Sequence, residues 1–150
     1  MNDTFKIVHT SILAFCNQFA EQSQTNNMSD TLTITDFDAH ADIQRLPTDE
    51  DLIGPLEFSM VMDEKLIEVT TNIAISTVED TNITRLRALT NSLFQKLTPG
   101  QRIPLVDPTN RAPIGTLVTM NGTAILPISR TSTRPLQLIS VQMGADLAGP

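Results

Sequence analysis

The residue types that most often carry enzyme chemistry are scarce in this chain of 150 residues. It contains two histidines, His9 and His40, and one cysteine, Cys16. A hydrolytic triad or a multi-histidine metal cage needs several such side chains in one pattern, and the sequence has no such pattern. Cys16 stands beside an apolar stripe without an activating histidine, which favours a structural thiol over a nucleophile. Gly-rich phosphate loops are absent as well. We therefore expect a protein that is not an enzyme, with no catalytic residues and no cofactor.

Four potential metal ligands alternate along one acidic segment: Asp36, Asp38, His40 and Asp42. A calcium loop also needs a turn glycine and a late bidentate glutamate, and neither stands at the required offset. An acidic, mobile loop over residues 38–54 is therefore favoured over a metal site, and we expect no bound metal.

The charges are distributed unevenly along the chain. Residues 1–80 contain three bases and fifteen acids, a net charge of −12, whereas residues 81–150 contain seven bases and two acids, a net charge of +5. One interpretation is an uneven but solvated surface. The other is that each copy has two oppositely charged faces and packs against the next copy, as the contacts in a ring require. The total of −7 argues against a general nucleic-acid binder, which needs a basic surface.

A long antiparallel hairpin over residues 56–78 is the element that must organise the rest. Apolar residues recur at every second position on both sides of residues 63–65, for example Phe58 and Met60 before them and Val69 and Ile73 after them. A period of two places one set of side chains on a buried face and the other set toward solvent.

Two amphipathic helices are predicted to pack on this hairpin. The first, over residues 4–22, has an apolar stripe at spacings of three and four: Phe5, Val8, Ile12, Phe15 and Phe19. The second, over residues 82–97, has a leucine stripe and ends before Pro99 and Gly100. Arg85 and Arg87 stand in its first turn, where the helix dipole disfavours cations, which suggests that they serve a partner; a solvated face remains the alternative. No apolar run approaches the roughly 20 residues that span a bilayer, and the N-terminus lacks a secretion signal.

The remaining segments are predicted to be β-strands. A short strand is expected over residues 31–37, and the C-terminal strands over residues 102–143. Pro104 suits an edge strand, and Asn121-Gly122 predicts a tight hairpin between residues 114–120 and 123–128. The expected fold is therefore a single α+β domain over residues 1–150, with an antiparallel sheet built on the central hairpin and packed against two helices.

This order of elements resembles the tail-terminator, or tail-completion, proteins of tailed bacteriophages. The resemblance is carried by the element order and by these segments: helix 4–22, hairpin 56–78, helix 82–97 and strands 123–143. The extended material over residues 102–120 departs from the family's pattern. The resemblance implies a structural virion protein that forms a homohexameric ring, caps the tail tube and joins it to the head or neck. Its partners would be copies of itself, the tail tube protein and a head–tail connector. It would be assembled in the host cytoplasm, without a membrane, and DNA would pass through it without specific binding.

The resemblance also implies roles for the charged residues. Candidate contacts to a neighbouring subunit or ring are Arg102, Arg111, Arg130 and Arg134. Arg85 and Arg87, which the helix dipole indicates independently of the resemblance, are further candidates. Because family lumens tend to be acidic, the segment Asp49, Glu50 and Asp51 is a candidate lumen-facing loop. Charge reversal at Arg130 and Arg134 is expected to weaken assembly in a salt-dependent way.

Two other classes of protein fit the same sequence. One is another part of the same particle, either a head–tail adaptor or a tail tube subunit; a tube subunit would stack into filaments. The other is a non-viral, soluble α+β binding module, which would be a monomer or dimer with a concave apolar pocket.

Overall fold

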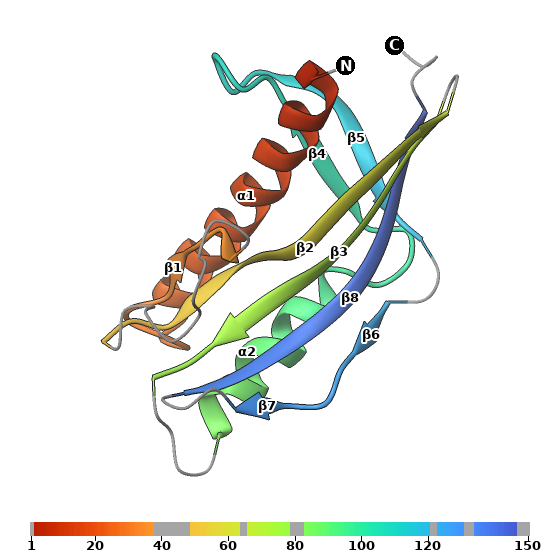
Figure 1. The fold of residues 1–150 in the computed structure, drawn as a ribbon. Helices are drawn as coiled ribbons and strands as arrows, with labels where there is room; N and C mark the ends of the chain where they lie inside the picture. Colours follow the sequence, from red (N-terminus) through yellow and green to blue (C-terminus); the bar gives the residue numbers. More distant parts are fainter. Residues whose placement is uncertain are drawn as a thin grey trace.

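The central hairpin consists of the two strands β2 (Leu52–Asp63) and β3 (Leu66–Ser76), which run across the middle of the molecule (Figure 1). They pair antiparallel from Leu52 opposite Ser76 to Asp63 opposite Leu66, with one irregularity between Leu56 and Ser59. The structure is a computed structural model, and it describes residues 2–37, 49–63, 66–78, 83–120, 123–130 and 134–146. The hairpin expected from the alternating apolar residues is confirmed.

The hairpin is part of a mixed, mostly antiparallel sheet in the order β1-β2-β3-β8-β5-β4. The other strands of the described residues are β1 (Thr33–Ile34), β4 (Arg102–Val106), β5 (Pro113–Thr119), β6 (Ala124–Ile125), β7 (Ser129–Arg130) and β8 (Pro135–Asp146). β8 pairs with β3 from Leu136 to Asp146 and takes β5, β6 and β7 on its other edge. β1 is parallel to β2, and β4, which contains Pro104, is the edge strand beyond β5 as predicted.

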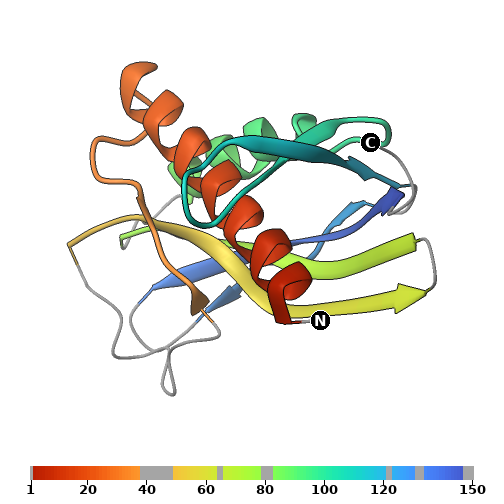
Figure 2. The ribbon, with the colours of Figure 1, turned by 90° about the horizontal axis from the view of Figure 1, so that it is seen from above.

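Both helices pack on the same face of the curled sheet (Figure 2). α1 spans Asn2–Thr25 and lies against β1, β2 and β4, while α2 spans Thr84–Gln95 and lies against β3, β6 and β8. Val8, Ile12 and Phe19 of the predicted stripe are buried, and so are the α2 leucines. Within the described chain no helix has the length and apolar character needed to cross a membrane. The predicted α+β fold, a hairpin-based sheet packed against two helices, is confirmed.

The predicted hairpin at Asn121-Gly122 is wrong. β5 and β6 do not pair with each other; both run antiparallel to β8, with Val118 opposite Gly144 and Ala124 opposite Ser140. The chain therefore continues in one direction along β8, whose 12 residues provide an edge long enough for several short strands. A turn dipeptide between two apolar runs carries only local information, and residues 121–122 themselves lie outside the described residues.

The two ends of the hairpin differ in burial. Near the start of β2, both faces of the sheet are covered, because a second apolar cluster of Phe37, Leu52, Ala74 and Leu136 packs on the side opposite the main core. At the other end the strands extend away from α2 (Figure 1). Val61, Met62 and Leu66 there are 65%, 45% and 50% exposed. We call these three residues the apolar tip.

Candidate functional site

Asp51, expected in a mobile, lumen-facing loop, is instead a buried carboxylate that is 1% exposed and immediately precedes β2. It accepts hydrogen bonds from Ser29 Oγ at 2.6 Å and from the Val78 backbone N–H at 2.8 Å. Arg85 Nε donates a third at 2.8 Å, as part of an ion pair. The expectation of a lumen-facing Asp51 is therefore wrong, because its charge is neutralised inside the subunit.

The environment of Asp51 acts on its pKa in opposite directions. Burial alone would raise the pKa, since it removes the carboxylate from water. The hydrogen bonds from Arg85, Ser29 and Val78, together with the charge of Arg85, outweigh burial and hold the pKa below its ordinary value. Asp51 is therefore ionised and paired at neutral pH. The ion pair also explains why Arg85 stands in the first turn of α2: its charge partner, Asp51, lies within the same chain.

Arg134, expected as a contact to a neighbouring subunit, is also buried, at 3% exposed. Its Nε donates to Ser76 Oγ at 2.7 Å, and its Nη2 donates to the backbone carbonyl oxygens of Ser76 and Glu50. Burial lowers the pKa of the guanidinium, while the charge of Asp51 opposes that change. The interface assignment of Arg134 is therefore wrong: this side chain fastens the starts of β2 and β8 to the end of β3.

The other predicted charged residues lie at the surface, apart from Arg130, whose side chain is outside the described residues. Arg87, Arg102 and Arg111 are exposed, as is Asp49, and Glu50 is half-buried. The exposed acids of the described residues are Glu21, Asp30, Asp49, Glu57 and Glu68, and the exposed bases are Lys6, Arg87, Lys96, Arg102 and Arg111. The exposed acids lie on or beside α1, β2 and β3. The exposed bases lie on or beside α2, on β4 and in the loop between β4 and β5, except Lys6, which lies on α1. We call these two regions the acidic side and the basic side.

The residues considered for catalysis or metal binding do not assemble into a site. Cys16 is fully buried, and burial raises the pKa of its thiol to about 12, so it stays a protonated core side chain. The Oδ2 atom of Asp36 lies 3.1 Å from the Nε2 atom of His9. Across the ranges that the structure describes, no three His, Cys or carboxylate side chains gather as metal ligands. Asp38, His40 and Asp42 lie outside those ranges.

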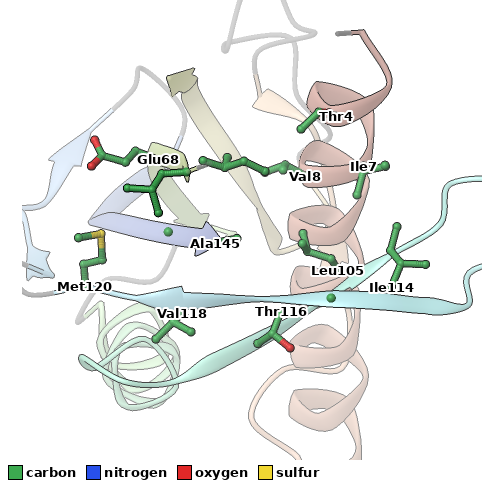
Figure 3. A pocket seen from close by; sticks show the side chains of 14 residues that line it. Thr4, Ile7, Val8, Glu68, Leu105, Ile114, Thr116, Val118, Met120 and Ala145 are labelled. Atoms are coloured by element: carbon green, nitrogen blue, oxygen red, sulfur yellow. The ribbon is translucent and has the colours of Figure 1, made fainter. Parts of the chain in front are cut away.

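An apolar groove of about 660 Å³ opens beside the apolar tip (Figure 3). We call it the distal groove. Its walls come from the first turns of α1, the start of β3, the β4–β5 ribbon and the end of β8. Ile7 and Ile114 lie toward one end, and Glu68 and Met120 toward the other (Figure 3). Glu68, Thr4 and Thr116 are the polar side chains among the lining residues.

Exposed apolar side chains surround this groove. Beside the tip residues, the large apolar side chains exposed at this end are Phe5, Ile114, Val118 and Met120. Exposed apolar side chains beside a groove are typical of a binding surface, because they leave apolar area in water until something covers it. The sequence contained one indication of these exposed side chains. Val61 and Met62 are adjacent apolar residues, and successive side chains of a strand point to opposite faces, so both cannot point into the same core.

The chemistry of the groove suits binding. Its lining is mostly aliphatic, and among the lining residues that the structure describes the titratable side chain is Glu68. No family model matches the chain, and no curated protein is significantly similar to it.

Proposed function

We propose that this protein is a ring-forming structural subunit, specifically a tail terminator that caps the tail tube of a tailed bacteriophage and joins it to the head or neck. The proposal rests on the element order, which combines a long hairpin, two helices on one face of the sheet and a closing strand. It places the protein in the virion tail or neck, assembled in the host cytoplasm as a homohexamer. The tail tube protein and a head–tail connector are its neighbours.

The observation that carries the self-assembly proposal is the separation of the exposed charges. In the sheet, β2 and β3, which carry exposed acids, lie on the other side of β8 from β4, which carries Arg102, although α1 of the acidic side packs against β4 and α2 of the basic side packs against β3. A ring subunit needs two different, complementary patches, and opposite charges steer such patches together. The internal pair of Asp51 and Arg85 uses one charge from each half of the chain.

Two of the three acids proposed for the lumen remain candidates for that role. Asp49 is exposed and Glu50 is half-buried, so both side chains can contribute to an acidic inner surface. Negative charge there would repel phosphate and let DNA pass without specific binding.

The test is the solution mass by light scattering, combined with negative-stain images. We expect rings of about six copies, the number that the resemblance implies. Charge reversal of two exposed bases, Arg87→Glu on α2 and Lys96→Glu at its C-cap, should reduce the mass and make the remaining assembly more sensitive to salt. These positions replace Arg130 and Arg134 in the test, because reversing the buried Arg134 would disrupt the fold itself.

Gln18→Glu is the control for this test, because it adds one negative charge at an exposed position on α1, on the acidic side, and should leave the mass unchanged. A wild-type monomer at high concentration would contradict the proposal. Filaments in the images would indicate the related tail tube subunit instead.

A second candidate function is a soluble binding module for small apolar ligands, and the distal groove favours it. Its volume of about 660 Å³ lies within the range of roughly 300–1,000 Å³ that is usual for ligand pockets. This candidate predicts a monomer or dimer whose groove binds a fluorescent fatty acid stoichiometrically. Loss of that binding in a Gly115→Phe variant, which fills the groove from β5, would support it; a wild-type ring without binding would exclude it.

A further inference from the structure

We propose that residues 59–62 of β2 pair edge to edge with the same residues of a second copy of this chain, antiparallel, about a two-fold axis at Val61. The contact continues the sheet of one copy into the sheet of the other. It differs from the contact proposed within a ring, and it does not depend on the assignment to a phage tail.

The outer edge of β2 is open beyond its first residues. β1 pairs with it at Leu52 and Ile53, and Thr35 N–H donates to the carbonyl oxygen of Ile53 at 2.8 Å. Farther along, no strand of the described residues pairs with this edge, and the distal half of β2 forms a margin of the sheet (Figure 2). An open strand edge presents a row of backbone N–H and C=O groups on which another strand can form.

The outer edge at the opposite side of the sheet, on β4, is protected. Pro104 has no N–H to donate, and the N–H of Val106 donates to Ser11 Oγ of α1 at 2.9 Å. α1 also packs along this strand. Of these two edges, the one on β2 is therefore available for strand addition.

The register of the sheet shows which backbone groups of β2 point outward. The N–H of Met120 donates to the carbonyl oxygen of Gln142, so the even-numbered residues of β8 face away from β3. Because hydrogen-bonding directions alternate along a strand, the odd-numbered residues of β3 bond to β8 and the even-numbered ones bond to β2. The even-numbered residues of β3 lie opposite Ser59 and Val61, so Met60 and Met62 direct their N–H and C=O groups to the open edge.

These outward groups are self-complementary. Met60 and Met62 give each copy two donors and two acceptors. A two-fold axis at Val61 places Met60 of one copy opposite Met62 of the other, and Met62 opposite Met60. In an antiparallel ladder, two residues paired in this way exchange both of their hydrogen bonds. All four groups of one copy therefore find partners in the second copy.

The side chains favour a second copy over a charged partner. None of residues 59–62 is charged, so two antiparallel copies bring no like charges opposite each other within this segment. Val61 and Met62 are exposed, on opposite faces of the strand. Pairing covers both of them, with Val61 beside Val61 of the second copy on one face and Met62 beside Met60 on the other.

Cysteine cross-linking tests both the pairing and its register. The two copies of residue 61 form a pair without direct hydrogen bonds, whose Cα atoms lie about 4.5 Å apart, within the reach of a disulfide. Val61→Cys should therefore give covalent pairs on a non-reducing gel after oxidation with copper phenanthroline. The wild type should stay uncross-linked, because Cys16 is fully buried. This assay reports the contact whether or not the copies also form a ring.

Ser59→Cys is the matched control, because Ser59 is exposed and lies two residues before Val61 on the same face of β2. About the same axis, its two copies lie about 13 Å apart along the strands, too far for a disulfide. We expect no cross-link in this variant. Equal cross-linking of the two variants, or none in either, would overturn the proposal.

Met62→Pro tests the role of the backbone. It removes an outward N–H without removing a hydrogen bond to β3, and an edge strand tolerates proline at such a position. Added to Val61→Cys, it should abolish the cross-link, while thermal unfolding followed by circular dichroism checks that the fold persists. A double variant that folds and still cross-links as fast as Val61→Cys would overturn the strand pairing.

Discussion

The carboxylate of Asp51 joins parts of the chain that are far apart in sequence. Ser29 follows α1, Val78 follows β3 and Arg85 belongs to α2, and all three donate hydrogen bonds to this one side chain. The backbone N–H of Asp51 donates in turn to Thr31 Oγ1 at 3.2 Å. A single side chain therefore fixes how α2 and the loop after α1 meet the base of the central hairpin.

Asp51→Asn should destabilise the protein by about 3 kcal/mol, because it leaves Arg85 without its charge partner and replaces one acceptor oxygen by a donor. The value lies at the low end for a buried pair, since the Arg85 side chain is 35% exposed and water can solvate part of it. Urea denaturation measures the change. Asp49→Asn, at an exposed carboxylate two residues earlier, should alter stability by less than about 0.5 kcal/mol.

The stabilisation from Asp51 should disappear in acid. The pKa of Asp51 is lower in the folded protein than its ordinary value of about 3.9, so ionisation favours the folded state above that pH. As the pH falls through the folded pKa, the carboxylate is protonated and the contribution is lost. The stability difference between the wild type and Asp51→Asn should be constant above about pH 5 and should shrink below about pH 4. An equal difference at pH 7 and pH 3 would refute this account.

At the scale of elements, β1 can pair with β2 only because position 54 is a glycine. A Cβ atom there would lie 1.5 Å from the carbonyl oxygen of Thr35, which is a backbone atom and cannot rotate away. Thr35 N–H donates to the carbonyl oxygen of Ile53 at 2.8 Å, so the clash falls where the chain after β1 is hydrogen-bonded to β2.

Gly54→Ala should therefore displace the β1 segment and destabilise the protein by about 1–3 kcal/mol, as overpacking does in a tight interior. Gly144→Ala is the matched control in another strand, where the added Cβ would meet the flexible Met120 Sδ at 3.3 Å. We expect the control to cost less, and chemical denaturation of both variants provides the comparison. An equal loss of unfolding free energy in the two variants would mean that the contact with Thr35 has no special importance.

At the scale of the whole molecule, the proposed ring contact depends on charge, because the acidic and basic sides of neighbouring copies would attract each other. This contact should therefore respond to salt.

Raising the salt concentration from about 0.05 M to 1 M should dissociate the ring contact, because the screening length falls from more than 10 Å to about 3 Å. Light scattering across a salt series would detect the fall in mass. A ring that keeps its mass at about 1 M salt would mean that the ring contact is not mainly electrostatic.

The sequence by itself determined the elements and the faces that they bury. The period-two pattern located the central hairpin, the spacing of Val8, Ile12 and Phe19 located α1 and its buried stripe, and Pro104 identified an edge strand. These features follow from neighbours along the chain, because the periods of a strand and a helix decide which side chains share a face.

Only the tertiary structure decided which distant residues meet. It paired Asp51 with Arg85, buried Arg134 against Ser76, and aligned β5 and β6 along β8 instead of with each other. A charge on a linear sequence is the same whether it ends in solvent or beside an opposite charge from another element. The environment of that charge is set when the apolar faces pack together. The same packing leaves the side chains of the distal groove exposed near the far end of the β2–β3 hairpin.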